Sequence, residues 1–98
     1  MRERDIRVAL KKRVIEYGGE IRAVSWLGRR NAPDVLALLP YCAGKVDRSY
    51  HVFIEAKRPN KDATEAQARE HERLRAAGCM VLVINTIEEL DAWLPPLK

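Results

Sequence analysis

Hydrophobic and polar residues repeat along this chain with two spacings, one typical of helices and one typical of strands. The region from Glu3 to Tyr17 has an apolar residue every three or four positions, which predicts a helix with one buried face. The residues of that face are Ile6, Leu10, Val14 and Tyr17. Gly18-Gly19 follows directly and is expected to end the helix.

Apolar runs between turn signals predict four strands, which cover Glu20 to Trp26, Asp34 to Leu39, Ser49 to Lys57 and Met80 to Asn85. A basic loop, Leu27 to Ala32, and a turn region, Pro40 to Arg48, separate the first three. The last strand is a continuous apolar run, as expected of a strand that is covered on both faces. That pattern favours layers of helix and sheet over a β-barrel.

Two capping boxes predict where further helices begin. Thr64 to Gln67 opens a helix that runs to about Ala77, and Thr86 to Glu89 opens a short helix that ends near Leu94. The element order is therefore α-β-β-β-α-β-α. We predict an α/β fold with a mixed central sheet flanked by helices, formed by a single domain over residues 1–98.

Positive charge is concentrated in the first part of the chain, although the net charge is only +4. Residues 1–61 contain 14 Lys and Arg against 7 Asp and Glu, whereas residues 62–98 contain 4 against 7. This asymmetry is compatible with a surface that faces a phosphate backbone, and equally with a small basic protein that has no such role. The candidate phosphate contacts are Arg29, Arg30, Arg58 and Lys61. The alternative interpretation of each is a solvated surface charge.

Several other kinds of site are not indicated. Cys42 and Cys79 lack the spacing of a zinc site, and His51 and His71 lack metal-ligand spacing, so we predict that both histidines lie on the surface or on a strand face. No glycine-rich cofactor loop and no serine elbow is present, so we expect no organic cofactor. No apolar run is long enough to span a membrane, and we expect a soluble, intracellular, cytoplasmic protein.

The clearest chemical signal comes from Asp34, Glu55 and Lys57. Glu55 and Lys57 are two apart on a predicted strand and therefore share one face, and a hairpin would bring Asp34 beside Glu55. Phosphodiester cleavage needs oxygen ligands for a divalent cation, an oriented water and a cation near the phosphate. The two acids and the lysine supply these, and the carbonyl of Ala56 is a further candidate ligand.

The same residues also have ordinary interpretations, namely turn formation at Asp34 and a solvated ion pair between Glu55 and Lys57. Their place at the end of an apolar strand favours the functional interpretation, because buried charges need compensation. Glu3 lies on the apolar stripe of the first helix, where it either approaches the metal or stabilises the helix dipole. Gln67 is explained by its capping box without catalysis, but it also lies where it can orient a ligand.

Together these residues resemble the PD-(D/E)xK nuclease superfamily and, within it, the stand-alone VRR-Nuc (virus-type replication-repair nuclease) domain. The resemblance covers nearly the whole chain. The matching segments are the N-terminal helix with its acid, Gly18-Gly19, Gly28 to Asp34, Phe53 to Lys57 and the helix start from Thr64 to Gln67.

The resemblance implies a restriction-endonuclease-like core and Mg²⁺ or Mn²⁺ held by Asp34, Glu55 and the Ala56 carbonyl, with Glu3 close by. It also implies that Lys57 orients water or stabilises the phosphate, that Gln67 is the family's helix glutamine, and that the protein is a homodimer. Relatives often carry another acid where this chain has Arg7, so the choice between Glu3 and Asp5 as the helix acid stays open.

The leading hypothesis is a metal-dependent, structure-specific DNA endonuclease that acts on branched DNA such as Holliday junctions. Two alternatives remain at this point. One is a non-catalytic nucleic-acid-binding module that keeps the nuclease fold, and the other is an interaction protein with no role in nucleic-acid binding. The completeness of the acid, acid and lysine set favours the enzyme, because clustered acids repel DNA unless a metal lies among them.

Overall fold

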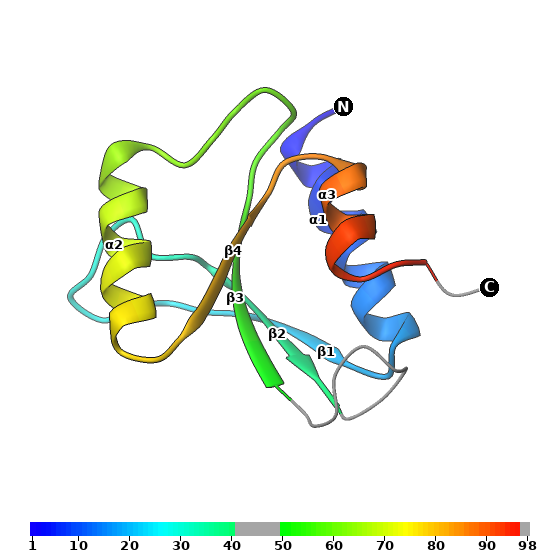
Figure 1. Ribbon diagram of the computed structural model, residues 1–98, viewed down its shortest axis with the longest axis horizontal. Helices are drawn as coiled ribbons and strands as arrows, with labels where there is room; N and C mark the ends of the chain where they lie inside the picture. Colours follow the sequence, from blue (N-terminus) through cyan, green and yellow to red (C-terminus); the bar gives the residue numbers. More distant parts are fainter. Residues whose placement is uncertain (41–49, 97–98) are drawn as a thin grey trace.

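The computed structural model describes residues 1–40 and 50–96, and within these ranges the chain forms the elements in the predicted order (Figure 1). They are α1 (Glu3–Glu16), β1 (Glu20–Ala23), β2 (Val35–Leu39), β3 (Tyr50–Ala56), α2 (Glu65–Ala76), β4 (Met80–Ile84) and α3 (Ile87–Trp93). The predicted fold class is therefore confirmed. Most of the predicted turn region before β3, including Cys42, lies outside the described residues.

A four-stranded sheet in the order β1-β2-β3-β4 forms the centre of the described chain. The first three strands are antiparallel neighbours, whereas β4 pairs with β3 in parallel, so the sheet is mixed as expected. The parallel pair requires a crossover connection, which α2 provides. In the register, Val35 lies opposite Ile54, and Ile54 lies opposite Leu82.

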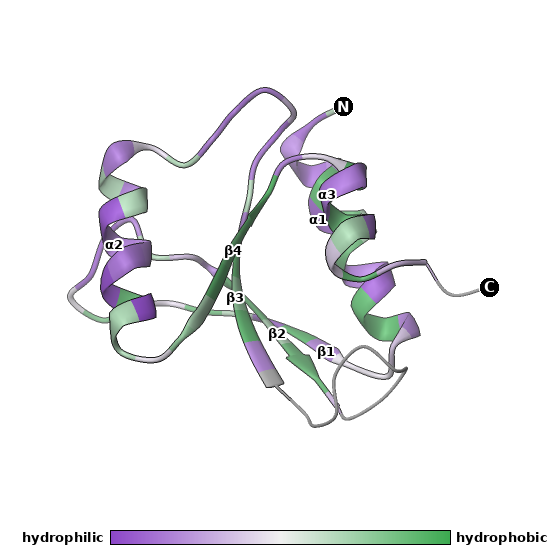
Figure 2. Ribbon diagram, viewed as in Figure 1, coloured by the Kyte–Doolittle hydropathy of each residue, from purple (hydrophilic) through white to green (hydrophobic). Residues whose placement is uncertain are grey.

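The main hydrophobic core lies between the sheet and the pair α1 and α3. The predicted apolar stripe of α1 is confirmed, because all of its members are buried: Ile6, Leu10, Val14 and Tyr17. Figure 2 shows that β2 and β4 are largely hydrophobic, whereas α2 is predominantly hydrophilic. Arg13 joins the two core helices, since its guanidinium donates to Asp91 at 2.8 Å and to the Leu94 carbonyl at 2.6 Å.

Helix α2 lies on the other side of the sheet from α1 and α3 and packs against β4 (Figure 1). Strand β4 is therefore covered by helices on both faces, as its continuous apolar sequence predicts, although it lies at one edge of the sheet. The prediction for the first strand was wrong at its end, because β1 stops at Ala23 and does not reach Trp26. The Trp26 indole instead donates to the Pro33 carbonyl at 2.6 Å and its ring packs on Phe53.

Candidate active site

The pairing of β2 with β3 brings the predicted acids together. Val35 lies opposite Ile54 in an antiparallel register, so the residue before one strand, Asp34, is next to the residue after Ile54, which is Glu55. The two carboxylates are close enough to repel each other, and the Lys57 ammonium acts on Glu55 in the opposite sense. The predicted hairpin therefore places Asp34, Glu55 and Lys57 at one end of the sheet.

Glu55 is a buried carboxylate. Its residue is only 7% exposed, on the sheet face that α2 covers. Burial raises the pKa of Glu55, and the nearby Asp34 raises it further, while the hydrogen bond with His71 and the charge of Lys57 act in the opposite direction. The fold thus holds a carboxylate in a place that disfavours its charge, which is a frequent property of functional sites.

His71 is a buried residue of α2 that contacts Glu55, so the prediction that it lies on the surface or on a strand face was wrong. The residue is 1% exposed, and its Nε2 lies 3.4 Å from Oε1 of Glu55. The misplacement has a clear cause: α2 is polar over most of its surface, so the sequence shows no apolar stripe that marks its buried side. A weaker signal was available in the helical spacing of Gln67, His71 and Leu74, which lie with Glu70 and Ala66 among the less exposed residues of the helix. The other histidine, His51, is exposed as predicted.

Arg7 connects the helix acid with the sheet acid. Its guanidinium Nη2 lies 3.2 Å from Oδ2 of Asp34 and 3.1 Å from Oε2 of Glu3. Glu3 therefore lies on the side of α1 that faces Asp34, whereas Asp5 is exposed and accepts a hydrogen bond from the backbone N–H of Arg2. The position that departs from the family pattern thus supplies a cation between two acids, and Glu3 is the helix acid nearer the site.

Gln67 performs the capping role that its sequence context predicts. Its side-chain oxygen accepts a hydrogen bond from the Thr64 backbone N–H at 2.9 Å, and the Thr64 hydroxyl accepts one from the Gln67 N–H at 3.1 Å. This reciprocal pair satisfies two backbone donors at the start of α2. A site role for Gln67 stays a prediction, since the side chain is engaged at the helix end.

The predicted basic residues occupy two separate loops. Arg29 and Arg30 lie in the loop before β2, against α2, whereas Arg58 and Lys61 are exposed in the turn after β3. That turn closes with a hydrogen bond from the Lys61 N–H to the Arg58 carbonyl at 3.1 Å, and the Asn85 amide donates to the Lys61 carbonyl at 2.8 Å. Both loops leave the sheet at the end where the acids lie.

A groove of about 460 Å³ opens next to Asp34, between α1 and β1. Its polar lining includes Arg7, Asp34 and two further basic residues, Lys11 and Arg22. These two residues carry no motif and were missed by the sequence prediction. Only the packing of α1 against β1 places them in the same groove as the acid.

The donor set at this end of the sheet fits a hard divalent cation. No group of three or more Asp, Glu, His or Cys side chains arranged for a metal occurs among the described residues. Mg²⁺, however, is commonly held by one or two carboxylates together with waters and substrate phosphate oxygens, and does not need a full protein cage. The adjacent carboxylates of Asp34 and Glu55, followed by the Ala56 carbonyl, are oxygen donors of that kind.

Comparison with known proteins agrees with this arrangement. No family model matches the sequence. A phage protein, "Putative nuclease p44" of Acyrthosiphon pisum secondary endosymbiont phage 1, is 37% identical over all 98 residues, which cover 97% of its own length. A solved structure described as a VRR_NUC domain superposes with a TM-score of 0.77 at 34% identity, over 92% of this chain and 90% of that one. This chain belongs to the VRR-Nuc family.

Membership in the VRR-Nuc family confirms the resemblance drawn from the sequence motifs. The mixed sheet and its flanking helices are the arrangement shared with the solved VRR_NUC domain, which matches nearly the full chain. Within the described part of the chain, no helix is both long and apolar enough to cross a membrane.

Proposed function

We propose that this VRR-Nuc domain is a structure-specific DNA endonuclease that hydrolyses phosphodiester bonds with Mg²⁺ or Mn²⁺, and that its preferred substrates are branched DNAs such as Holliday junctions. One observation carries the proposal. Glu55 is a buried carboxylate next to Asp34, and Lys57, two residues after it and just beyond the end of β3, acts on it with its positive charge. Two repelling carboxylates in such a place are stabilised by a cation, and a divalent metal is the cation that phosphodiester cleavage uses.

Each residue has a distinct role in the proposed reaction. Asp34 and Glu55, with the Ala56 carbonyl, hold the metal, which supplies a Lewis acid and a water of lowered pKa when bound. Lys57 orients the attacking water or offsets the charge that grows on the phosphate. His71 keeps the Glu55 carboxylate in place through its Nε2 contact. Glu3 and Gln67 remain proposed site residues whose side chains contact Arg7 and Thr64 in this structure.

The substrate backbone is expected to lie across the acids, along the basic residues on both sides of them. Arg7, Lys11 and Arg22 line the groove that contains Asp34. On the other side of the acids, the exposed Arg58 and Lys61 lie one and four residues after Lys57 in the chain. Positive residues on both sides of the acids favour contact with several successive phosphates.

The decisive test is cleavage of labelled linear, flap and four-way-junction DNA with Mg²⁺ or Mn²⁺. We expect the native protein to cut junction DNA fastest, and Asp34→Asn and Lys57→Ala to lower the rate by about 100-fold or more. Lys12→Ala, which removes an exposed lysine from α1, serves as the matched control and should cut at the native rate. If Asp34→Asn and Lys57→Ala cut as fast as the control, the site assignment is wrong.

Binding of Mn²⁺ by titration calorimetry separates the enzyme from a non-catalytic module that keeps the fold. We expect the native protein to bind Mn²⁺ and Asp34→Asn to bind it at least about tenfold more weakly, because one of two carboxylate ligands is lost. A protein that binds DNA but neither binds Mn²⁺ nor cuts any substrate of the panel is a binding module, and the proposal then fails.

A further inference from the structure

A second basic site lies away from the acids, between α2 and the loop of residues 28–31. The space there is a cleft of about 230 Å³. Four arginines and a single acid line it, so positive charge predominates. The charged residues of this arginine cleft are Arg29, Arg30, Arg69, Arg73 and Glu70.

The loop side of the arginine cleft is joined to α2 by an ion pair. Arg29 donates from Nε to Oε2 of Glu70 at 3.1 Å, and a second guanidinium nitrogen pairs with Oε1, so the contact is bidentate. These hydrogen bonds keep the pKa of Glu70 below its ordinary value, and Glu70 therefore stays ionised. Gly28 and Asn31, on either side of Arg29 and Arg30, have φ values of 72° and 64°, which turn the backbone sharply at both ends.

The helix side presents two arginines in one direction. Arg69 and Arg73 are four residues apart on α2, so they lie on the same side of the helix, and both are exposed. Ala66 lies one turn earlier on this side and has a small side chain, which leaves space between the helix and the loop. Neither Arg69 nor Arg73 forms an ion pair with any of the described residues, whereas Arg29 is paired.

Both segments that form the arginine cleft, α2 and the loop of residues 28–31, also lead directly to residues of the candidate active site. The residue that follows Glu70 on α2 is His71, which contacts Glu55. The loop of residues 28–31 leads within three residues to Asp34. A polyanion that lies in the cleft is therefore directed along the same two segments that position the acids.

We propose that the arginine cleft binds the phosphodiester backbone of the nucleic-acid substrate on one side of the scissile bond. The guanidinium groups of Arg30, Arg69 and Arg73 match the geometry and charge of phosphate oxygens. The pairing of Arg29 with Glu70 fixes the loop before the ligand arrives, so less conformational entropy is lost on binding. The choice of nucleic acid as ligand rests on the proposed nuclease function.

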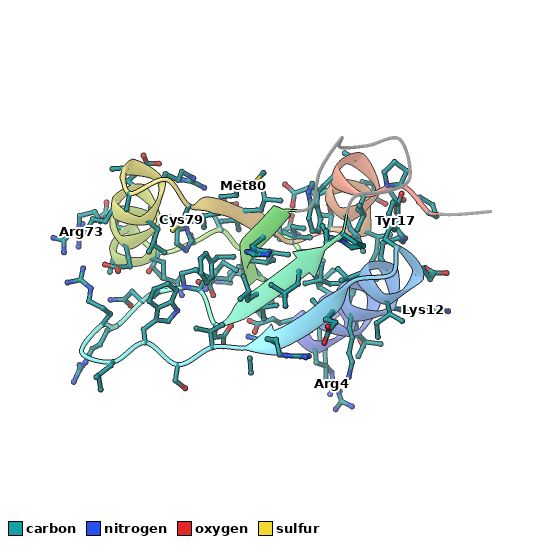
Figure 3. All side chains as sticks on the ribbon, turned by 90° about the horizontal axis from the view of Figure 1, so that it is seen from below. Arg4, Lys12, Tyr17, Arg73, Cys79 and Met80 are labelled. Atoms are coloured by element: carbon teal, nitrogen blue, oxygen red, sulfur yellow. The ribbon has the colours of Figure 1, made fainter. Side chains whose placement is uncertain are left out.

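The test measures DNA binding without cleavage, by fluorescence anisotropy in EDTA with a single-stranded and a duplex oligonucleotide. The variant Arg69→Gln/Arg73→Gln is compared with Arg4→Gln/Lys12→Gln, which removes the same charge from exposed positions on α1. Figure 3 shows Arg73 at one end of the molecule and Lys12 towards the other, with Arg4 at the lower edge of the view and away from Arg73. We expect the cleft variant to bind at least about tenfold more weakly, and the slope of log K against log salt to become shallower by about 1.4 to 1.8. The control is expected to stay within about twofold of the native protein.

A second pair of variants removes the effect of charge altogether. Ala66→Met fills the arginine cleft, whereas Ala68→Met places the same side chain at an exposed position of the same helix. We expect only the first to weaken DNA binding, by about fivefold or more. Circular dichroism of each variant checks that α2 is retained.

Three outcomes overturn the proposal. The first is an equal loss of DNA affinity in the cleft and control variants, and the second is native DNA affinity in Ala66→Met. The third is tight binding of inorganic phosphate by the native protein together with unchanged DNA affinity in the cleft variant. The last result identifies a site for a free anion and not for a backbone. Because no cleavage is measured, these outcomes are independent of the metal-site tests. If the native protein does not cut DNA but the cleft variant binds DNA more weakly, the proposal for the arginine cleft stands and only the proposed nuclease function fails.

Discussion

At the scale of single residues, folding raises the pKa of Glu55, so ionisation of this carboxyl costs the fold stability. Burial between β3 and α2 raises its pKa, and the neighbouring Asp34 acts in the same direction. A carboxylate whose pKa is raised on folding contributes stability below its unfolded pKa, and this contribution is lost as the pH rises through the folded pKa. The rest of the structure must therefore offset this loss of stability at the site, as is common where activity needs an unfavourable arrangement.

We predict that Glu55→Gln is more stable than the native protein at neutral pH in EDTA, because the amide has a similar shape without the charge. The difference in stability between the variant and the native protein should shrink as the pH falls. It should vanish below about pH 4, where the Glu55 carboxyl is protonated in both the folded and the unfolded state. Thermal unfolding followed by circular dichroism over this pH range measures it. Saturating Mn²⁺ should raise the midpoint of the native protein and leave that of Glu55→Gln nearly unchanged.

A lower midpoint for Glu55→Gln at neutral pH would contradict this account, since it would mean that the charged carboxylate stabilises the fold. The conservative change Lys11→Gln, in the groove on the other side of Asp34, provides a control for the loss of a charge near the site. It removes an exposed cation and is expected to alter the midpoint by only about 2 °C or less.

At the scale of elements, the junction between α1 and β1 depends on a close approach of backbone. Gly18 has a φ of 81°, which ends the helix in the left-handed region that glycine favours. Gly19 has no unusual φ, but a Cβ built there would lie 2.4 Å from the Leu38 carbonyl oxygen and 2.9 Å from Cγ1 of Val14. The two neighbouring glycines are thus required for different reasons, one conformational and one steric.

We predict that Gly19→Ala destabilises the protein by about 3 kcal/mol or more, because the backbone of β2 and the α1 helix must move apart to admit the methyl group. Gly18→Ala meets no atom closer than 3.7 Å, so it should cost only about 1 kcal/mol of left-handed strain. Urea unfolding of both variants gives the two free energies. A larger loss for Gly18→Ala than for Gly19→Ala would show that strain, and not the close approach, dominates this junction.

At the scale of the whole molecule, one described chain contains one set of Asp34, Glu55 and Lys57, whereas a four-way junction has two equivalent strands to cut. The described chain has a radius of gyration of 13.1 Å, the size expected for one compact unit of this length. A two-fold dimer would place two sites in symmetric positions for paired cuts.

We predict that the protein is a homodimer when bound to junction DNA. Light scattering should give twice the mass of the 98-residue chain, and small-angle scattering should give a radius of gyration clearly above that of one chain. Linear duplex of the same length serves as the control ligand. A monomer mass at every concentration that supports junction cleavage would rule this prediction out.

Local sequence patterns were sufficient to predict the order of the elements and most of the proposed site. The apolar spacing of α1, the capping box of α2 and the continuous apolar run of β4 are local patterns, which is why each element was placed within about three residues of its observed ends. The Glu-x-Lys spacing on β3 is local too. Its pairing with Asp34 required only that two successive strands form a hairpin.

The residues that meet these acids from distant parts of the chain could be identified only from the packing of the folded chain. Arg7 between Glu3 and Asp34, His71 against Glu55, and the joining of Arg29 with Glu70 all link residues from separate elements. The charge count along the chain pointed away from the arginine cleft, since Arg69 and Arg73 belong to the acidic part of the sequence. Contacts of this kind depend on how α1 and α2 pack on opposite sides of the sheet, and no local spacing records that packing.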